Sequence, residues 1–526
     1  MTEKVVVVGA GMVGHRFVDE LVRGDHQGRF EIELIGAEEY EPYNRILLSE
    51  VLAGRADLRA LGLPLPDADR VAFRRGTAVE EIDTASQVVV LADGSRTAYD
   101  RLVLATGARA FVPPLPGLAA SCDAASDDEG EPRHVHVLRT LDDTRNIAAR
   151  AMNAKHAVVL GGGLLGLEAA CGLRRRGVPV TVVDLDAHVM ATQLDAGPAR
   201  MLAAQLRSLG VDVITGASVA EVISAYGEIV AVRLTDERLL AADLMLVSCG
   251  IRAETAVAVA AGLTVDRGIV VDEDLCTSDP LVHAIGDCAQ PPTGMTGLLA
   301  PGWGQASRLA GLMLGHGAAE PFEAGAAQPP QRSKPDPVKL KAVGVDLVTM
   351  GVRAAHATED DRVLSVSDGG ALRHVDLVVR DGELVGLTCL GFPDVSAALT
   401  LAYDRRTPLP ADPLALLLPA SGAGAVEETA NPMRMPGSTT VCRCTGVTKK
   451  QIVTAWEEGA TTAEAVAGAT RATTGCGGCK DVVCGLVDWL NASDPATGTA
   501  TGPDAAPEPT RSTPVTPRNT PVESTT

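Results

Sequence analysis

Four cysteines near the C-terminal end of the chain arrive as two close pairs. Cys442 and Cys444 form a C-x-C pair, and after thirty-one intervening residues Cys476 and Cys479 form a C-x2-C pair. Four thiolates grouped in this way are typical of a metal centre. The spacing alone fits a structural zinc site, disulfide bonds or a [2Fe–2S] cluster. The glycines around the second pair would let backbone N–H groups approach the sulfurs of a cluster and tune its potential.

Two glycine-rich loops predict a second kind of chemistry, the binding of dinucleotides. In each loop an apolar run is followed by three glycines with G-x-G-x-x-G spacing. The first glycine permits a tight turn, the second lets the backbone approach a pyrophosphate, and the third lets helix and strand pack closely. A single triplet also fits an ordinary turn between a strand and a helix. The glycines are Gly9, Gly11 and Gly14 in the first loop and Gly161, Gly163 and Gly166 in the second.

An acidic residue follows each loop where a ribose ligand is expected. The run EIELIGAE ends at Glu38, and the run VPVTVVDLD has Asp184 at the predicted end of its strand. An acid at the second position accepts hydrogen bonds from a ribose 2′-hydroxyl and repels a 2′-phosphate, so NADH is favoured over NADPH. NADPH stays possible because Arg174, Arg175 and Arg176 precede that strand, although we interpret them as a solvated helix face.

Two further polar pairs follow apolar strands. Thr106 and Gly107 come after YDRLVLA, and Gly286 and Asp287 come after LVHAI. At a strand end, Asp287 would accept a hydrogen bond from a ribityl hydroxyl of FAD. The alternatives are a helix N-cap for Asp287 and a plain turn residue for Thr106. Two glycine loops and two such polar pairs, in this order along the chain, favour a pair of cofactor sites.

The elements that position these residues are strands and crossover helices. Up to about residue 318, Val- and Ile-rich runs alternate with Ala-, Leu- and Arg-rich stretches, which is typical of a parallel sheet. We therefore predict an α/β fold with two dinucleotide-binding, Rossmann-like domains, a small α/β domain and a small helical module. The predicted boundaries are 1–150 with 260–318, 151–259, 338–418, 438–491, and a disordered tail over 492–526.

Local signals refine the two smaller parts. Asp381-Gly382 between alternating apolar runs predicts a β-hairpin. Capping-box patterns at Thr448 with Gln451 and at Thr461 with Glu464 predict two short helices between the cysteine pairs. A third helix is predicted to begin near Cys479, and Pro-rich stretches over 320–337 and 419–437 are interpreted as linkers.

Bulk properties exclude several classes of partner. The 526 residues carry a formal net charge of −21, which repels nucleic acid and anionic membrane surfaces. No apolar segment approaches the roughly 20 residues that span a bilayer. Eleven cysteines in so long a chain without a signal peptide indicate a reducing, cytoplasmic compartment.

The motifs resemble a known family. Residues 1–318 look like the flavin-dependent pyridine nucleotide oxidoreductases that contain two dinucleotide-binding folds. LIGAEEYEPYNRILLSEVLAG (34–54) and GAGMVGHRF are similar to assimilatory nitrite reductase large subunits and to the electron-transfer subunit of assimilatory nitrate reductase. The resemblance implies that the first loop and Glu38 hold FAD, that Arg45 lies near its phosphates, and that the second loop holds NAD(P)H. It also places 297–306 beside the isoalloxazine.

The C-terminal segment resembles the bacterioferritin-associated ferredoxin type of [2Fe–2S] domain, which implies that Cys442, Cys444, Cys476 and Cys479 bind a cluster. Zinc is then the lesser alternative. The chain has Glu50 where rubredoxin reductases have a lysine, and no C-x4-C pair follows the first loop, so a disulfide relay is not expected. We name no catalytic side chain, because hydride transfer to a flavin needs stacking geometry more than an acid or base.

The order of sites predicts a converter between two-electron and one-electron carriers. Nitrite reductases of the family have further domains for a [4Fe–4S] cluster and sirohaem, which we do not find after Cys484. We therefore expect an electron-transfer subunit that serves a separate molybdenum nitrate reductase chain. The alternatives are a ferredoxin or rubredoxin reductase, the NADH-oxidising component of a nitrite reductase, or an NADH-sensing redox or zinc-binding regulator.

Overall fold

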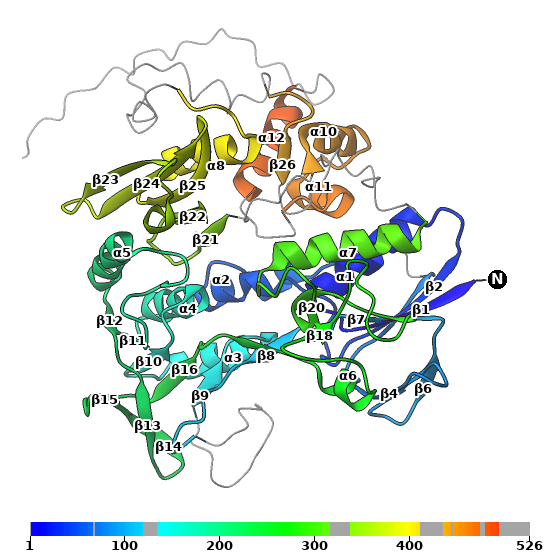
Figure 1. The fold of residues 1–526 in the computed structure, drawn as a ribbon, viewed down its shortest axis with the longest axis horizontal. Helices are drawn as coiled ribbons and strands as arrows, with labels where there is room; N and C mark the ends of the chain where they lie inside the picture. The colour runs from blue at the N-terminus through cyan, green and yellow to red at the C-terminus, as the bar shows by residue number, and fades with distance from the viewer. Residues whose placement is uncertain are drawn as a thin grey trace, which may run out of the picture.

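The computed structural model describes most of the chain: residues 2–66, 69–118, 134–315, 337–410, 435–442, 447–473 and 479–493. Two regions of sheet and helix lie next to each other, and a third sheet and a small helical module lie along their common side (Figure 1). Among the described helices, none has the length and hydropathy needed to cross a membrane. Most of both predicted linkers and most of the predicted tail lie outside the described residues.

A five-stranded parallel sheet with the order β19-β7-β1-β2-β3 forms the first region. Helix α1 (Met12–Gly24) follows the first strand and packs against α7 (Leu299–Met313). Val5, Val6 and Val7 are completely buried, as expected for a parallel sheet. The strands are β1 (Glu3–Val8), β2 (Phe30–Ile35), β3 (Val71–Arg74), β7 (Arg101–Leu104) and β19 (Val282–Ala284).

The second region repeats the design with the parallel order β12-β11-β10-β16-β9. Helix α4 (Leu164–Arg175) follows β10, and β9 adds residues that precede the predicted boundary at 151 to the edge of this sheet. The predicted pair of Rossmann-like folds is therefore confirmed. The strands are β9 (Val135–Val137), β10 (Ala157–Leu160), β11 (Val180–Asp184), β12 (Val211–Thr215) and β16 (Leu244–Val247).

Smaller antiparallel sheets and further helices belong to these two regions. Strands β4, β5 and β6 form one antiparallel sheet and β13, β14 and β15 form another, while β8 pairs with β17 between the regions. Their bounds are β4 (Val79–Asp83), β5 (Val88–Leu91), β6 (Arg96–Ala98), β8 (Ala108–Ala110), β13 (Val219–Ala225), β14 (Glu228–Leu234), β15 (Leu239–Ala241), β17 (Ile251–Ala253), α2 (Leu48–Leu52), α3 (Leu141–Ala151), α5 (Ala196–Ser208) and α6 (Ala256–Ala260).

The third sheet is antiparallel, with the order β21-β22-β25-β24-β23, and α8 (Pro393–Arg405) packs on it. The predicted hairpin is confirmed, because Asp381 and Gly382 join β24 to β25 with φ values of 51° and 80°. Positive φ at both positions is what a type I′ turn requires. The strands are β21 (Val338–Leu340), β22 (Leu347–Gly351), β23 (Arg362–Asp368), β24 (Arg373–Arg380) and β25 (Glu383–Leu390).

The described residues of the C-terminal module form a short β-pair and three helices around a small apolar core. The capping box of Thr448 and Gln451 is confirmed at the start of α10, whereas the one predicted for Thr461 and Glu464 is wrong, because Thr462 is the N-cap and Ala465 is the third helical residue. Thr462 caps α11, because its hydroxyl accepts a hydrogen bond from the backbone N–H of Ala465 at 3.1 Å. The elements are β26 (Thr440–Cys442), β27 (Val447–Thr448), α10 (Lys449–Glu457), α11 (Ala463–Thr470) and α12 (Lys480–Ser493).

Candidate functional site: two dinucleotide loops and a cysteine module

The first glycine loop lies between β1 and α1, at the carboxyl edge of the first sheet. Gly9 has a φ of 114°, and a Cβ atom there would lie 2.2 Å from the carbonyl oxygen of Ala105. A Cβ atom on Gly14 would lie 2.0 Å from the carbonyl oxygen of Gly9. A Cβ atom on Gly11 would meet nothing within 4 Å. The chain's own packing thus requires the first and third glycines, while the second faces open space at a helix N-terminus, which fits a bound pyrophosphate.

The other predicted residues of this site follow neighbouring strands. Thr106 and Gly107 come two and three residues after β7, and Gly286 and Asp287 follow β19 in a short 3-10 turn. Because β19, β7 and β1 are adjacent and parallel, these loops meet Gly9 at one edge of the sheet. The hydroxyl of Thr106 donates to the carbonyl oxygen of Glu254 at 2.7 Å, which holds this turn against the segment after β17.

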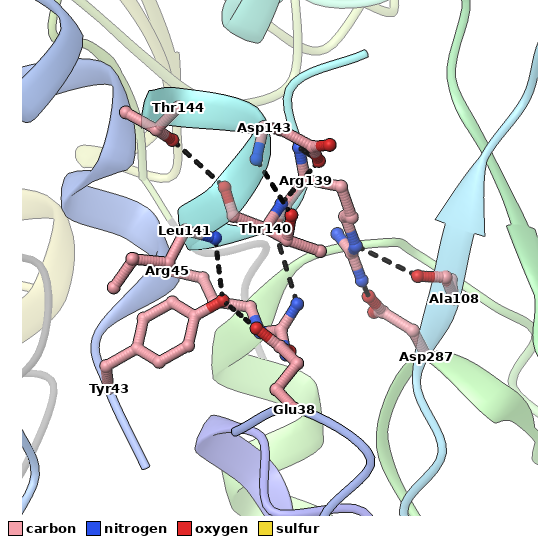
Figure 2. Close-up of polar contacts among 10 residues, drawn as sticks. All are labelled: Glu38, Tyr43, Arg45, Ala108, Arg139, Thr140, Leu141, Asp143, Thr144 and Asp287. Carbon is pink, nitrogen blue, oxygen red and sulfur yellow. Dashed lines mark hydrogen bonds and ion pairs between the residues drawn. The ribbon is translucent and has the colours of Figure 1, made fainter. Parts of the chain in front are cut away.

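Glu38 and Arg45 contact each other through an ion pair (Figure 2). Strand β2 ends at Ile35, so Glu38 lies three residues beyond the observed strand end and not at the end predicted for it. Its second carboxylate oxygen accepts a hydrogen bond from the hydroxyl of Tyr43 at 2.6 Å, and the same hydroxyl accepts from the backbone N–H of Leu141 at 3.1 Å. Burial and the Glu38 carboxylate raise the pKa of Tyr43, so its phenol is a proton donor at all physiological pH values.

Arg139 connects this group to Asp287 (Figure 2). Its side chain donates to the carboxylate of Asp287 at 2.9 Å and to the carbonyl oxygen of Ala108 at 2.9 Å, while its own carbonyl oxygen accepts from Arg45 at 3.3 Å. Asp287 is therefore paired with a cation rather than acting as the N-cap that was its alternative. Sequence reasoning missed Arg139 and Tyr43. Arg139 directly precedes the capping box of Thr140 and Asp143 that starts α3. This capping pattern, which follows an apolar strand, is visible in the sequence and could have identified the position.

A cavity of about 2830 Å³ joins these groups. It is several times larger than the 300–1,000 Å³ of a typical drug-sized pocket, so it suits an extended dinucleotide together with a second ligand. Gly302 at the start of α7 packs closely here, since a Cβ atom would lie 2.9 Å from a methyl group of Val13. The residues that line the cavity include Glu38, Arg139, Gly286, Asp287, Gly302 and Arg353.

The second glycine loop has the same construction. Gly161 has a φ of 111°, and a Cβ atom on it would lie 2.2 Å from the carbonyl oxygen of Ser248. A Cβ atom on Gly166 would lie 2.0 Å from the carbonyl oxygen of Gly161, whereas Gly163 again has nothing within 4 Å. The loop precedes α4 as the first loop precedes α1, so the two loops have equivalent space for a phosphate.

Asp184 is the last residue of β11, where it was predicted. Its carboxylate accepts hydrogen bonds from the backbone N–H groups of Gly162 at 2.7 Å and Asp186 at 3.0 Å, which hold it beside the glycine loop. Among the three arginines before that strand, Arg176 donates to the carbonyl oxygen of Leu52 at 2.5 Å. Arg176 thus ties α4 to α2.

We expect Asp184→Ala to weaken NADH binding and to narrow the preference for NADH over NADPH. A hydrogen bond to a charged group contributes about 1.5–3 kcal/mol, so the KM for NADH should rise roughly 10- to 100-fold. The KM for NADPH should fall, because the carboxylate no longer repels its 2′-phosphate. Asp212→Ala, an exposed acid on the adjacent strand β12, is the matched control. An unchanged ratio of kcat/KM values for the two nucleotides in Asp184→Ala would contradict this role.

Two of the four paired cysteines lie among the described residues. Cys442 ends β26 and Cys479 immediately precedes α12, and both belong to the buried apolar core of the module with Val447, Ile452 and Val483. Cys444 and Cys476 lie outside the described residues. A thiolate beside a helix N-terminus is stabilised by the helix dipole, and a buried apolar surround limits the access of solvent to a thiolate-ligated cluster. Cys484, on α12, is half-buried.

Comparison with protein-family models gives two matches. The pyridine nucleotide-disulphide oxidoreductase model matches residues 3–308, and the BFD-like [2Fe-2S] binding domain model matches residues 440–488. A search of solved structures finds the covalent putidaredoxin reductase–putidaredoxin complex, with a TM-score of 0.65 and 27% sequence identity over 81% of this chain and 97% of that chain.

Curated relatives align along nearly the whole chain. The large subunit of NAD(P)H nitrite reductase from Klebsiella oxytoca is 36% identical over 93% of this chain and 49% of its own length. The assimilatory nitrate reductase electron transfer subunit from Bacillus subtilis (strain 168) is 32% identical over 94% of this chain and 60% of its own length. The chain thus spans about half to three fifths of these relatives.

Proposed function

Because the chain belongs to the pyridine nucleotide-disulphide oxidoreductase family and includes a BFD-like [2Fe-2S] binding domain, we propose that it carries electrons from NADH to a separate acceptor protein. The family match implies FAD, NAD(P)H and a [2Fe–2S] cluster as cofactors. When bound, the nicotinamide supplies a hydride, the flavin exchanges electrons in pairs or singly, and the cluster carries one electron at a time.

The chain's own residues bind and orient these groups. We propose that the first loop and the N-terminus of α1 hold the FAD pyrophosphate, with Glu38 and Arg45 at the adenosine and phosphate end. The ion pair of Arg139 with Asp287 fixes the turn after β19, where the flavin side of the cavity begins. The second loop and Asp184 hold NADH, and Cys442, Cys444, Cys476 and Cys479 ligate the cluster.

We propose further that the acceptor is a nitrate reductase chain that contains molybdenum. The observation that supports this most is the alignment over 94% of the chain, through both the flavin and the cluster regions, with a relative named as an electron transfer subunit. The alignment with nitrite reductase large subunits favours a second candidate, the NADH-oxidising part of a nitrite reductase. A cytoplasmic location fits the free thiols of Cys171, Cys249, Cys276, Cys288 and Cys389 in the described part of the chain.

The first test is an anaerobic titration of the purified protein with NADH. We expect the visible spectrum to contain flavin and cluster absorption, and both to bleach as NADH is added. Steady NADH-dependent reduction of a viologen dye or ferricyanide should accompany this. A spectrum without cluster absorption would favour zinc, because a zinc thiolate site is colourless, and absence of steady turnover would favour a sensor.

The second test identifies the acceptor. We expect a molybdenum-containing protein to co-purify with the chain, and the mixture to reduce nitrate at the expense of NADH. Co-purification with a sirohaem protein and NADH-dependent reduction of nitrite would instead support the second candidate. Both activities are measured on the same preparation, so the result distinguishes the two candidate electron acceptors.

A further inference from the structure

One side chain of the C-terminal module reaches out of it and into the first region. Arg471 directly follows α11, where its φ of 65° places it in the left-handed conformation and its N–H donates to the carbonyl oxygen of Ala467 at 2.7 Å. Its guanidinium forms an ion pair with Asp19 and lies 4.0 Å from the carboxylate of Glu20. Both acids belong to α1, and Figure 1 shows α11 beside α1 and α7.

The group is buried at the contact between the two parts. The side chain of Arg471 is 16% exposed, and those of Asp19 and Glu20 are 3% and 10% exposed. The hydroxyl of Ser307 on α7 donates to Glu20 at 2.9 Å, so one of the two acids that face Arg471 is also held by α7. A guanidinium removed from water in this way is costly unless carboxylates compensate it, so the module's position and the ion pair depend on each other.

The charge is present at neutral pH. Burial, and then the repulsion of Arg16, lower the pKa of Arg471 to about 10, which still leaves the group protonated. On α1 itself, Arg16 pairs with Glu20 and Arg23 pairs with Asp19, so the helix supplies as many cations as anions. Burial lowers the pKa of the nearby His15, so that ring is neutral. Arg471 therefore adds one charge from the module to an already balanced set.

The location of the contact relates the cluster to the flavin region. Arg471 lies eight residues before Cys479, and Asp19 lies eight residues after Gly11, or about 12 Å along α1 from the pyrophosphate loop. The contact therefore fixes the end of α11, eight residues before Cys479 in the sequence, against the helix that begins at the FAD loop.

We propose that the contact of Arg471 with Asp19 and Glu20 is a docking latch that holds the [2Fe–2S] module on the FAD-binding region in the orientation that receives electrons from the flavin. This inference rests on the proposed function. Arg471 is a positioning residue, since it acts through the placement of the module and touches neither cofactor nor substrate.

The test compares Arg471→Glu with Arg406→Glu in the holoprotein. Arg406 also follows a helix in the left-handed conformation, with a φ of 51°, but it is exposed on the small domain, which makes it a matched control. In anaerobic stopped-flow experiments we expect NADH to reduce the flavin of Arg471→Glu at the normal rate, while reduction of the cluster slows at least about 10-fold. Small-angle scattering of the same sample should give a larger radius of gyration. Arg406→Glu should change neither.

Exchanging the two charges distinguishes a loss of the docking contact from a loss of folding. We expect Asp19→Arg combined with Arg471→Asp to recover part of the cluster reduction rate and of the compact dimensions that each single variant loses. Arg471→Met, which keeps the aliphatic part of the side chain, serves if Arg471→Glu does not fold. Unchanged dimensions, or expanded dimensions with a normal rate of cluster reduction, would overturn the latch. If NADH does not reduce the cluster of the unmodified protein, the proposed function fails, while scattering still tests the docking.

Discussion

Cys479→Ser is expected to abolish transfer of electrons beyond the flavin while NADH still reduces the flavin. Cys479 is buried in the core of the module beside Cys442, and both glycine loops lie in the other two regions. Changes to groups that only support a metal ligand cost about 10–100-fold in metal affinity, so loss of a ligand should cost more. We expect cluster absorption to disappear and turnover with the natural acceptor to fall by at least about 100-fold.

Cys484→Ser is the matched control. Cys484 is on α12, five residues after Cys479, but it is half-buried and outside the two pairs. We expect this variant to keep the cluster and full turnover. Normal cluster absorption and acceptor turnover in Cys479→Ser would refute the assignment of the four cysteines, and a fall in flavin reduction would mean that the module supports the flavin region as well.

The second large effect concerns Gly11 and Gly163, the middle glycines of the two loops, where an added Cβ atom would meet nothing within 4 Å. Gly11→Val should lose FAD, because the added side chain occupies the space in which the pyrophosphate meets the helix N-terminus. The protein should still fold, since Gly11 has φ and ψ values of −71° and −179°, which any residue adopts, and nothing lies within 4 Å of its Cβ position. Loss of one or two hydrogen bonds to a charged phosphate, at about 1.5–3 kcal/mol each, predicts FAD binding at least about 100-fold weaker.

Gly163→Val tests the second loop with the same chemistry. Gly163 also precedes a helix in the extended conformation, with φ and ψ of −78° and −177°, and is equally open. We expect it to retain FAD and to raise the KM for NADH by a similar factor. Bound flavin can be counted from the visible spectrum of each purified variant, and thermal unfolding of the FAD-free proteins controls for folding. If Gly163→Val lost FAD and Gly11→Val retained it, the assignment of the two loops would be reversed.

Most corrections to the sequence-based expectations concern boundaries. The capping box expected at Thr461 does not form, because α11 begins after Thr462 and the third helical position is then Ala465, whose side chain cannot bond back to the N-cap. Strand β2 ends before Glu38 rather than at it, since the turn after Ile35 already contains Gly36. Strand β9 joins the second sheet although its residues precede the expected boundary, because its pairing with β16 joins segments more than 100 residues apart.

Features that depend on local backbone requirements could be predicted from the amino-acid sequence. Gly9 and Gly161 must adopt positive φ, Asp381-Gly382 must form a tight turn, and close cysteine pairs bring sulfurs together whatever the rest of the chain does. The pairing of distant charges, by contrast, follows from the packing of the whole chain: Glu38 with Arg45, Arg139 with Asp287, and Arg471 with Asp19. Side chains on separate loops or domains pair according to how sheets and helices pack, and no local spacing encodes that geometry.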